Sequence, residues 1–307
     1  MRWNEALDGY WLSKRRSMSE HTVSDYSITF RRFGIYIKNG EVERITSKQV
    51  NAFLTHIADE YELSAKTIQN AWIALSSFWT WGHDELGLPH IIRNGVEMPS
   101  AKSPPPLPYT EDEVRALLKA CESMNAWSPK TQRHVEGTRQ TKLRDIAIML
   151  VLLDTGMRVS ELCALKVSDY DRKQGRLIIR HGKGDKPRVV YMGQAAQRAL
   201  WRYLAERTET PAGAPLLATR ADRRMNKDSV LGMIAHAGER AGVAGASCHR
   251  FRHTFAVNFL RNGGNILALQ DLLGHSSMEM VRRYARQAEV DLAKAQKRAS
   301  PADNWGL

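Results

Sequence analysis

The chain has 307 residues, of which 43% are apolar and 25% charged. This is enough for two ordinary domains and is typical of a globular protein rather than a disordered one. It contains no apolar run of about 18 residues and does not begin with a signal-peptide pattern, so we expect a soluble protein of a bacterial-type cytoplasm, without membrane contact. Three widely spaced cysteines, Cys121, Cys163 and Cys248, do not indicate a disulfide framework.

The net charge of +12 is distributed unevenly along the chain. Residues 1–98 hold 11 Lys and Arg against 12 Asp and Glu, whereas residues 99–307 hold 34 against 21. A basic excess of this size favours a polyanionic partner, most often nucleic acid. A basic surface that binds no ligand is the alternative interpretation.

The first part of the chain has the pattern of a helical domain. Apolar residues recur at steps of three and four within residues 19–36 and 65–81, and Thr46 opens a third segment of this kind, so we expect a compact domain of four or five helices. Trp72, Phe78, Trp79 and Trp81 could stack on bases, but their helical spacing favours a place in the core.

A proline-rich segment separates the two parts. Five of the 11 prolines fall within residues 99–108, PSAKSPPPLP, which favours an extended polyproline II spacer of roughly 30 Å. We therefore predict a helical domain over residues 1–98, a linker over 99–108 and a second domain over 109–307.

The second domain is predicted to be mainly helical with a small antiparallel sheet. Thr110 and Glu113 form a capping box, and residues 145–153, DIAIMLVLL, are apolar nearly all round, which indicates a buried central helix. Residues 176–180 and 188–191 read as two strands of a hairpin, and helical patterns resume from residue 195.

Two basic residues of this domain occupy turns. Arg158 lies where Gly156 can end one helix and Ser160 can begin the next, and its fixed donors suit a bidentate grip on phosphate oxygens. Lys183 lies between two glycines at the tip of the hairpin, where it could protonate a departing oxygen. A solvated surface position is the alternative for each.

Three further candidates follow near the end of the chain. His249 and Arg252 are three residues apart and share one face of a helix, so an imidazole that accepts a proton would lie beside a phosphate-binding arginine. His275 lies at a helix junction, and Tyr284 comes about two turns into the next helix. Its local pattern alone would assign Tyr284 to the core.

Other chemistries lack their sequence patterns. Cys248, His249, His253 and His275 do not complete a zinc-ligand spacing, and no H-E-x-x-H, Walker or G-x-G-x-x-G motif occurs. We expect neither a metal nor a nucleotide cofactor.

Four segments resemble the motifs of the tyrosine recombinases, or phage integrases. These segments are TGMRVSELCAL, HGKGDKPRVV, HRFRHTFA and LGHSSMEMVRRYA, which occur in the order found in the family. The amino-terminal helices resemble its core-binding, SAM-like domain. Because the chain begins directly with these helices, it is similar to two-domain Xer-type or small mobile-element integrases that lack an arm-binding domain.

The resemblance implies six metal-independent catalytic residues: Arg158, Lys183, His249, Arg252, His275 and Tyr284. The two arginines would bind the scissile phosphate, and Tyr284 would attack phosphorus to form a 3′-phosphotyrosine. His249 would accept the tyrosine proton, Lys183 would protonate the leaving oxygen, and His275 would support the phosphate by hydrogen bonding. Glu161 would orient its neighbours.

The resemblance also implies partners. The protein would act as a nucleoid-associated homotetramer on two specific double-stranded DNA sites, with a carboxyl-terminal segment from about residue 289 packed on a neighbouring copy. Two alternatives remain open: a type IB topoisomerase-like nicking enzyme, and a DNA-binding protein that has lost catalysis.

Overall fold

The computed structural model describes residues 1–93, 95–100, 106–128, 133–180, 187–274, 278–288, 296 and 300–307. The chain divides into two compact units, Met1–Pro104 and Pro105–Leu307, and each is described by itself. The division falls within the proline-rich segment 99–108. In the described residues, no helix has both the length and the apolar character needed to cross a membrane.

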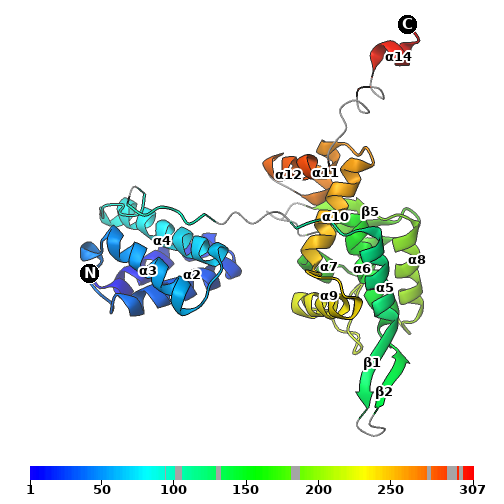
Figure 1. Cartoon of the computed structure of the whole chain (residues 1–307), viewed down its shortest axis with the longest axis horizontal. Helices are drawn as coiled ribbons and strands as arrows, with labels where there is room; N and C mark the ends of the chain where they lie inside the picture. Colours follow the sequence, from blue (N-terminus) through cyan, green and yellow to red (C-terminus); the bar gives the residue numbers. More distant parts are fainter. Residues whose placement is uncertain are drawn as a thin grey trace. The chain divides into compact units, whose positions relative to one another are not determined.

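Helices make up most of the first unit (Figure 1), and their bounds are α1 Trp3–Lys14, α2 Glu20–Tyr36, α3 Ser47–Glu60 and α4 Ala65–Leu86. Side-chain hydroxyls of Ser19, Thr46 and Ser64 cap α2, α3 and α4 by accepting a backbone N–H three residues later. The three helices predicted from periodicity are therefore confirmed, and α1 completes the domain.

Aromatic side chains form the core of this unit. Trp3 packs against Phe33 and Phe78, with ring centroids 5.0 and 4.4 Å apart. Phe78, Trp79 and Trp81 are buried, while Trp72 is half-buried and its indole N–H donates to the carbonyl of Val96 at 3.1 Å. The aromatic stripe is thus part of the core, as its helical spacing predicted.

In its described residues, the second unit is mainly helical and contains five strands. Its helices are α5 Glu111–Glu122, α6 Lys142–Thr155, α7 Val159–Ala164, α8 Gln194–Ala205, α9 Lys227–Ala241, α10 Cys248–Arg261, α11 Ile266–Leu273, α12 Met278–Ala288 and α14 Pro301–Trp305. Its strands are β1 Ser123–Ser128, β2 Arg133–Thr138, β3 Tyr170–Asp171, β4 Arg176–Ile179 and β5 Arg188–Tyr191.

Helix α6 is the centre of this unit, because it contacts α5, α8, α10 and β5. Its residues Ala147, Ile148, Val151 and Leu152 are buried, which confirms the predicted central helix. Strands β3, β4 and β5 form an antiparallel sheet in that order, with Ile179 paired to Arg188. The mainly helical fold with a small antiparallel sheet is therefore confirmed.

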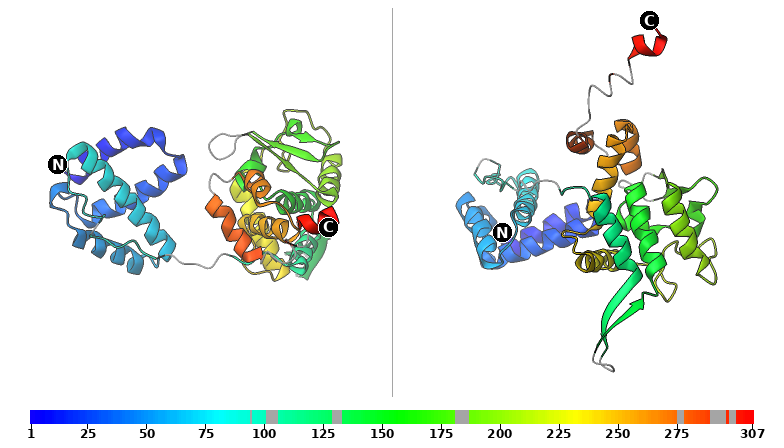
Figure 2. Two further views of the ribbon diagram at one scale, coloured as in Figure 1. Left: turned by 90° about the horizontal axis from the view of Figure 1, so that it is seen from above. Right: turned by 45° about the vertical axis from the view of Figure 1, so that its right-hand side comes forward.

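One element was not predicted from the sequence. Strands β1 and β2 form an antiparallel hairpin whose register runs from Ser123 opposite Thr138 to Ser128 opposite Arg133, and the hairpin extends beyond the end of α5 (Figures 1 and 2). Apolar and polar residues alternate over only the first four residues of SMNAWS and do not alternate in RHVEGT, so the pair lacks the sustained alternation by which a hairpin is recognised. The periodicity rule therefore missed them.

The last helices of the unit share a small apolar cluster. Its buried members come from α10, α11 and α12 and are Ala256, Val257, Leu260, Leu269, Leu273, Val281, Tyr284 and Ala288. Tyr284 is only 6% exposed. The local sequence pattern around Tyr284 therefore predicted the burial of this side chain correctly.

Two glycines end the helices nearest to this cluster. Gly156 follows α6 at φ +59° and Gly274 follows α11 at φ +62°, both in the left-handed region that glycine adopts without strain. A Cβ at Gly156 would also lie 2.9 Å from Leu273 Cδ2 and in collision with the Phe255 ring. The end of α6 therefore requires glycine for two separate reasons.

We predict that Gly156→Ala destabilises the second unit much more than Gly242→Ala. Gly242 ends α9 at φ +66° with open space around the missing Cβ, so alanine there adds only backbone strain of about 1–2 kcal/mol. At Gly156 the collision should bring the total to roughly 2–5 kcal/mol. Urea unfolding followed by circular dichroism measures both, and equal losses would contradict the steric argument.

Candidate active site

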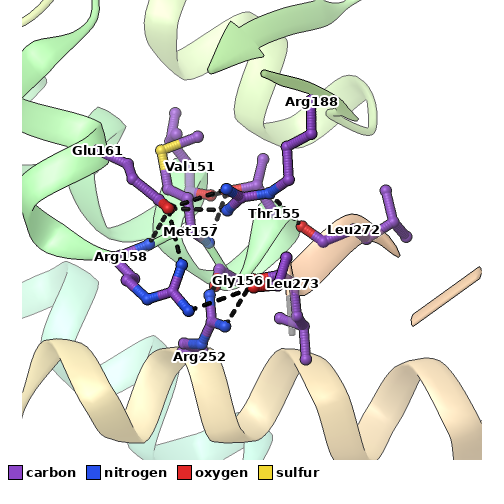
Figure 3. A network of polar contacts seen from close by, with 11 residues as sticks. Val151, Thr155, Gly156, Met157, Arg158, Glu161, Arg188, Arg252, Leu272 and Leu273 are labelled. Atoms are coloured by element: carbon purple, nitrogen blue, oxygen red, sulfur yellow. Dashed lines mark hydrogen bonds and ion pairs between the residues drawn. The ribbon is translucent and has the colours of Figure 1, made fainter. Parts of the chain in front are cut away.

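Four of the six predicted site residues lie in the described part of the second unit. Arg158 precedes α7, His249 and Arg252 lie on α10, and Tyr284 lies on α12. Lys183 and His275 lie outside the described residues. Figure 3 shows that Arg158 and Arg252 come close to each other, together with Glu161 and Arg188.

The Glu161 carboxylate accepts two hydrogen bonds from Arg158 at the start of helix α7. The backbone N–H of Arg158 donates to Glu161 Oε2 at 2.8 Å, and its guanidinium Nη1 donates to Oε1 at 2.9 Å. Helix α7 begins at Val159 with Arg158 as its cap, rather than at Ser160 as the sequence suggested. The carboxylate three residues ahead satisfies the free N–H, so a serine cap is not needed.

Arg188 approaches the same carboxylate from strand β5. Its Nη1 and Nη2 donate to the two oxygens of Glu161 at 2.8 and 2.7 Å, and its Nε donates to the carbonyl of Leu272 at 2.8 Å. Glu161 is 5% exposed. Burial alone would raise its pKa, but the hydrogen bonds from Arg188 and from the Arg158 backbone outweigh that effect and hold the pKa below its usual value.

Arg252 is held by two helix ends instead of a carboxylate. Its Nη1 donates to the carbonyl of Gly156 at 2.7 Å and its Nη2 to that of Leu273 at 2.8 Å (Figure 3). These carbonyls close α6 and α11, where the helix dipole is negative. Burial, together with the charge of Arg158, lowers the pKa of Arg252 to about 10, so it remains a cation at neutral pH.

The polar centre therefore has a surplus of positive charge. Among the contacts of the described residues, three guanidinium groups, those of Arg158, Arg188 and Arg252, lie around the carboxylate of Glu161. Buried cations of like sign repel one another unless an anion joins them. The centre is therefore suited to bind an anion with one or two negative charges, such as a phosphate ester.

His249 lies one turn before Arg252 on α10, as the spacing predicted, but the two differ in exposure. His249 is exposed and Arg252 buried. Partial desolvation of the imidazole, and next the charge of Arg252, lower the pKa of His249 below its usual value of 6.5. The ring is thus neutral at pH 7 and can accept a proton.

Sequence reasoning missed a histidine beside Tyr284. The rings of His253 and Tyr284 lie 5.3 Å apart at an angle of 52°, and His253 is 3% exposed. Its burial excludes contact of His253 with a DNA backbone, and its neighbour Arg250 forms an ion pair with Glu113 at 2.7 Å. The local spacing to Tyr284 gives no signal, because the contact joins two different helices.

The sequence also gave no sign of the role of Arg188. It appeared there only as the first residue of a strand. Its ion pair with Glu161 joins residues 27 positions apart, which no local pattern can reveal. Among the residues that the structure describes, no group of three or more His, Cys, Asp and Glu side chains could hold a metal ion.

The chain matches two family models that cover its two units. Residues 109–290, more than half of the chain, match the phage integrase family, and residues 12–86 match the N-terminal SAM-like domain of phage integrases. The chain belongs to the phage integrase family. This confirms the resemblance seen in the four motifs.

Curated members of the phage integrase family are similar over nearly the whole length. The tyrosine recombinase XerC of Pelobacter propionicus is 30% identical, with 94% of this chain and 92% of that protein covered. The tyrosine recombinase XerA of Thermococcus onnurineus is 32% identical, with 92% and 90% covered. The expected enzyme class, a tyrosine-type site-specific recombinase, is therefore confirmed.

The fold is also that of a solved integrase. The structure of the Tn1549 transposon integrase in complex with a circular intermediate DNA aligns with a TM-score of 0.76 at 17% identity, covering 92% of this chain and 95% of that one. At this identity the likeness supports the fold alone.

We predict that acid destabilises the second unit through its histidines. Desolvation is the main cause that lowers the pKa of both the exposed His249 and the buried His253. Well above pH 6.5 these rings are neutral in both the folded and the unfolded chain, but as the pH falls through 6.5 the unfolded chain binds protons first, so stability falls.

The urea midpoint of the protein should therefore decrease from pH 8 to pH 5.5. His253→Phe keeps a ring against Tyr284 and removes one titrating group, so its midpoint should decrease less. If the urea midpoint of His253→Phe decreased as much as that of the wild type, protonation of His253 would not be a cause of the acid destabilisation.

Proposed function

We propose that the protein cleaves and rejoins double-stranded DNA at a specific site through a 3′-phosphotyrosine at Tyr284. The observation that carries this proposal is the surplus of two positive charges that Arg158, Arg188 and the buried Arg252 form around the buried Glu161. A phosphodiester brings one negative charge to such a centre. An attacking phenolate brings a second, so the transition state carries the charge that the centre would neutralise.

The arginines have separate tasks in this proposal. Arg158 and Arg252 bind the non-bridging oxygens of the scissile phosphate. Arg252 is suited to this because its hydrogen bonds to Gly156 and Leu273 fix its guanidinium before DNA binds, and a preorganised donor needs no rearrangement during the reaction.

Proton transfers complete the proposed step. A phenol in water has a pKa of about 10, so the tyrosine proton must be removed, and we assign His249, neutral at pH 7, to accept it. As the Tyr284 Oη–P bond forms, the P–O5′ bond breaks and the 5′ oxygen takes a proton from Lys183. His275 would support the phosphate by hydrogen bonding. The phosphotyrosine conserves the bond energy, and a 5′-hydroxyl from a second duplex can therefore reverse the step without a nucleotide cofactor.

The two parts of the chain have different roles in this proposal. Residues 1–98 form a core-binding DNA domain, residues 99–108 a linker, and residues 109–307 the catalytic domain. A homotetramer acts on two DNA sites, and the segment from about residue 289 supports the oligomer. Solved relatives support a DNA partner, since the Tn1549 integrase structure is a complex with DNA.

The test is a search for a covalent adduct. The protein is incubated in EDTA with sheared genomic DNA of its source organism, and denaturant-resistant protein–DNA complexes are isolated and sequenced. We expect adducts at one recurrent site, because the proposed step needs no metal. Tyr284→Phe should form none while it still binds the same DNA, since it lacks only the hydroxyl.

Tyr26→Phe is a matched control, because Tyr26 lies on α2 in the other unit and should form adducts normally. Cleavage that EDTA abolishes and that leaves no adduct would exclude the mechanism. Adducts and plasmid relaxation without strand exchange between two sites would support a topoisomerase-like enzyme instead.

Binding should depend steeply on salt, because residues 99–307 hold 34 Lys and Arg against 21 Asp and Glu. For six to ten phosphate contacts, affinity should fall by about 10³–10⁵-fold between 50 and 200 mM salt. Fluorescence anisotropy with a labelled duplex measures this slope. An affinity that is independent of salt would contradict the DNA-binding surface.

A further inference from the structure

Arg188 occupies the stem of the segment that carries Lys183. It is the first residue of β5 and pairs with Ile179, the last residue of β4. Lys183 lies between these two residues, in the part of the chain outside the described residues. The position of this paired stem therefore determines where the segment with Lys183 begins and ends.

The Arg188 side chain ties this stem to the phosphate-binding centre. It is 10% exposed and meets both oxygens of Glu161, at 2.8 and 2.7 Å, with two parallel N–H donors. Such a bidentate pair fixes direction as well as distance. Glu161 in turn accepts from the backbone and side chain of Arg158. One carboxylate thus connects the stem of the hairpin to the first arginine of the site.

The third donor of Arg188 reaches another segment of the site. Its Nε donates to the carbonyl of Leu272 at 2.8 Å, in the last turn of α11, and Arg252 binds the carbonyl of the next residue, Leu273, at 2.8 Å. Figure 3 shows the three arginines converging on this point from different elements. Arg188 is therefore the side chain by which strand β5 contacts both Glu161 and the end of α11.

Neutralising the carboxylate of Glu161 does not by itself require Arg188. Arg158 already gives Glu161 an ion pair at 2.9 Å, and the charge of Arg188 is one of the causes that lower the pKa of Arg252. Its placement therefore adds repulsion to a centre that is already positive. In addition to its charge, Arg188 supplies hydrogen bonds that connect the hairpin stem to Glu161, the partner of Arg158, and to the end of α11, which Arg252 also contacts.

We propose that Arg188 is a positioning residue that holds the Lys183 segment in register with the phosphate bound by Arg158 and Arg252. This inference rests on the proposed function, in which Lys183 protonates the leaving oxygen. A displacement of about 1 Å can cost a reaction roughly 100-fold. Through this contact Arg188 would act on the leaving-group step, in addition to the positive charge that it adds to the centre.

The test compares two leaving groups in single-turnover formation of the covalent adduct. One duplex has the normal P–O5′ bond at the scissile position, and the other has a P–S5′ bond there. When the P–S bond breaks, sulfur leaves as a thiolate without taking a proton, because thiols, with a pKa of about 8.5, are far more acidic than alcohols. The sulfur substrate therefore does not need Lys183.

We expect Arg188→Lys to slow adduct formation on the oxygen substrate by roughly 10- to 100-fold and on the sulfur substrate by less than about 3-fold. Lysine keeps a charge beside Glu161 but cannot form the two-point contact or reach Leu272 as well. Lys183→Ala should show the same rescue by sulfur. Arg188→Gln gives a second measure, and the ratio of the two rates in one sample does not depend on how much of that variant is folded.

Arg176→Lys is the matched control. Arg176 lies at the other end of the same strand pair and faces Asp171 at 3.2 Å, with 38% and 30% of the two side chains exposed, so the change should alter both rates by less than about 2-fold. Equal slowing of Arg188→Lys on both substrates, or no slowing on either, would overturn the role of Arg188. If Lys183→Ala is not rescued by sulfur, the proposed acid itself fails and this inference fails with it.

Discussion

The burial of one carboxylate among three arginines is the constraint on which the second unit depends. Guanidinium groups repel one another, and burying one costs several kcal/mol. Glu161 offsets part of this for Arg158 and Arg188 by accepting four hydrogen bonds from them, at 2.7 to 2.9 Å. The start of α7 and the start of β5 meet at this carboxylate. The contact that packs α7 against β5 therefore also assembles the charged centre.

The proposed nucleophile shows that a core position and a reactive position can coincide. Tyr284 is 6% exposed within the apolar cluster of α10, α11 and α12, and its ring contacts that of the buried His253. Packing of a ring restricts its rotamers, which is useful to a group that must present one oxygen in one direction. Local periodicity cannot separate these two uses, because both place an aromatic residue on the inner face of a helix.

Patterns within about ten residues of one another predicted much of the structure. The helix that begins after Thr46, the glycine that ends α6, and the hairpin of β4 and β5 all follow from local chemistry. The motifs also predicted Arg158, His249, Arg252 and Tyr284 as site residues. The contacts of Arg188 with Glu161 and of His253 with Tyr284 depend on how distant elements pack, so the sequence could not reveal them. The β1–β2 hairpin was missed because apolar and polar residues alternate in only the first four residues of β1 and not in β2.

The way in which Arg252 is anchored has a consequence for how this centre can change over evolutionary time. Two of its partners are the main-chain oxygens of Gly156 and Leu273, and every amino acid carries such an oxygen. Side chains around Arg252 can therefore change without removing these two partners, provided that α6 and α11 end where they do. Arg158 is anchored differently, because its ion pair requires the carboxylate side chain of Glu161. Divergent relatives should thus vary more freely around the second arginine than around the first.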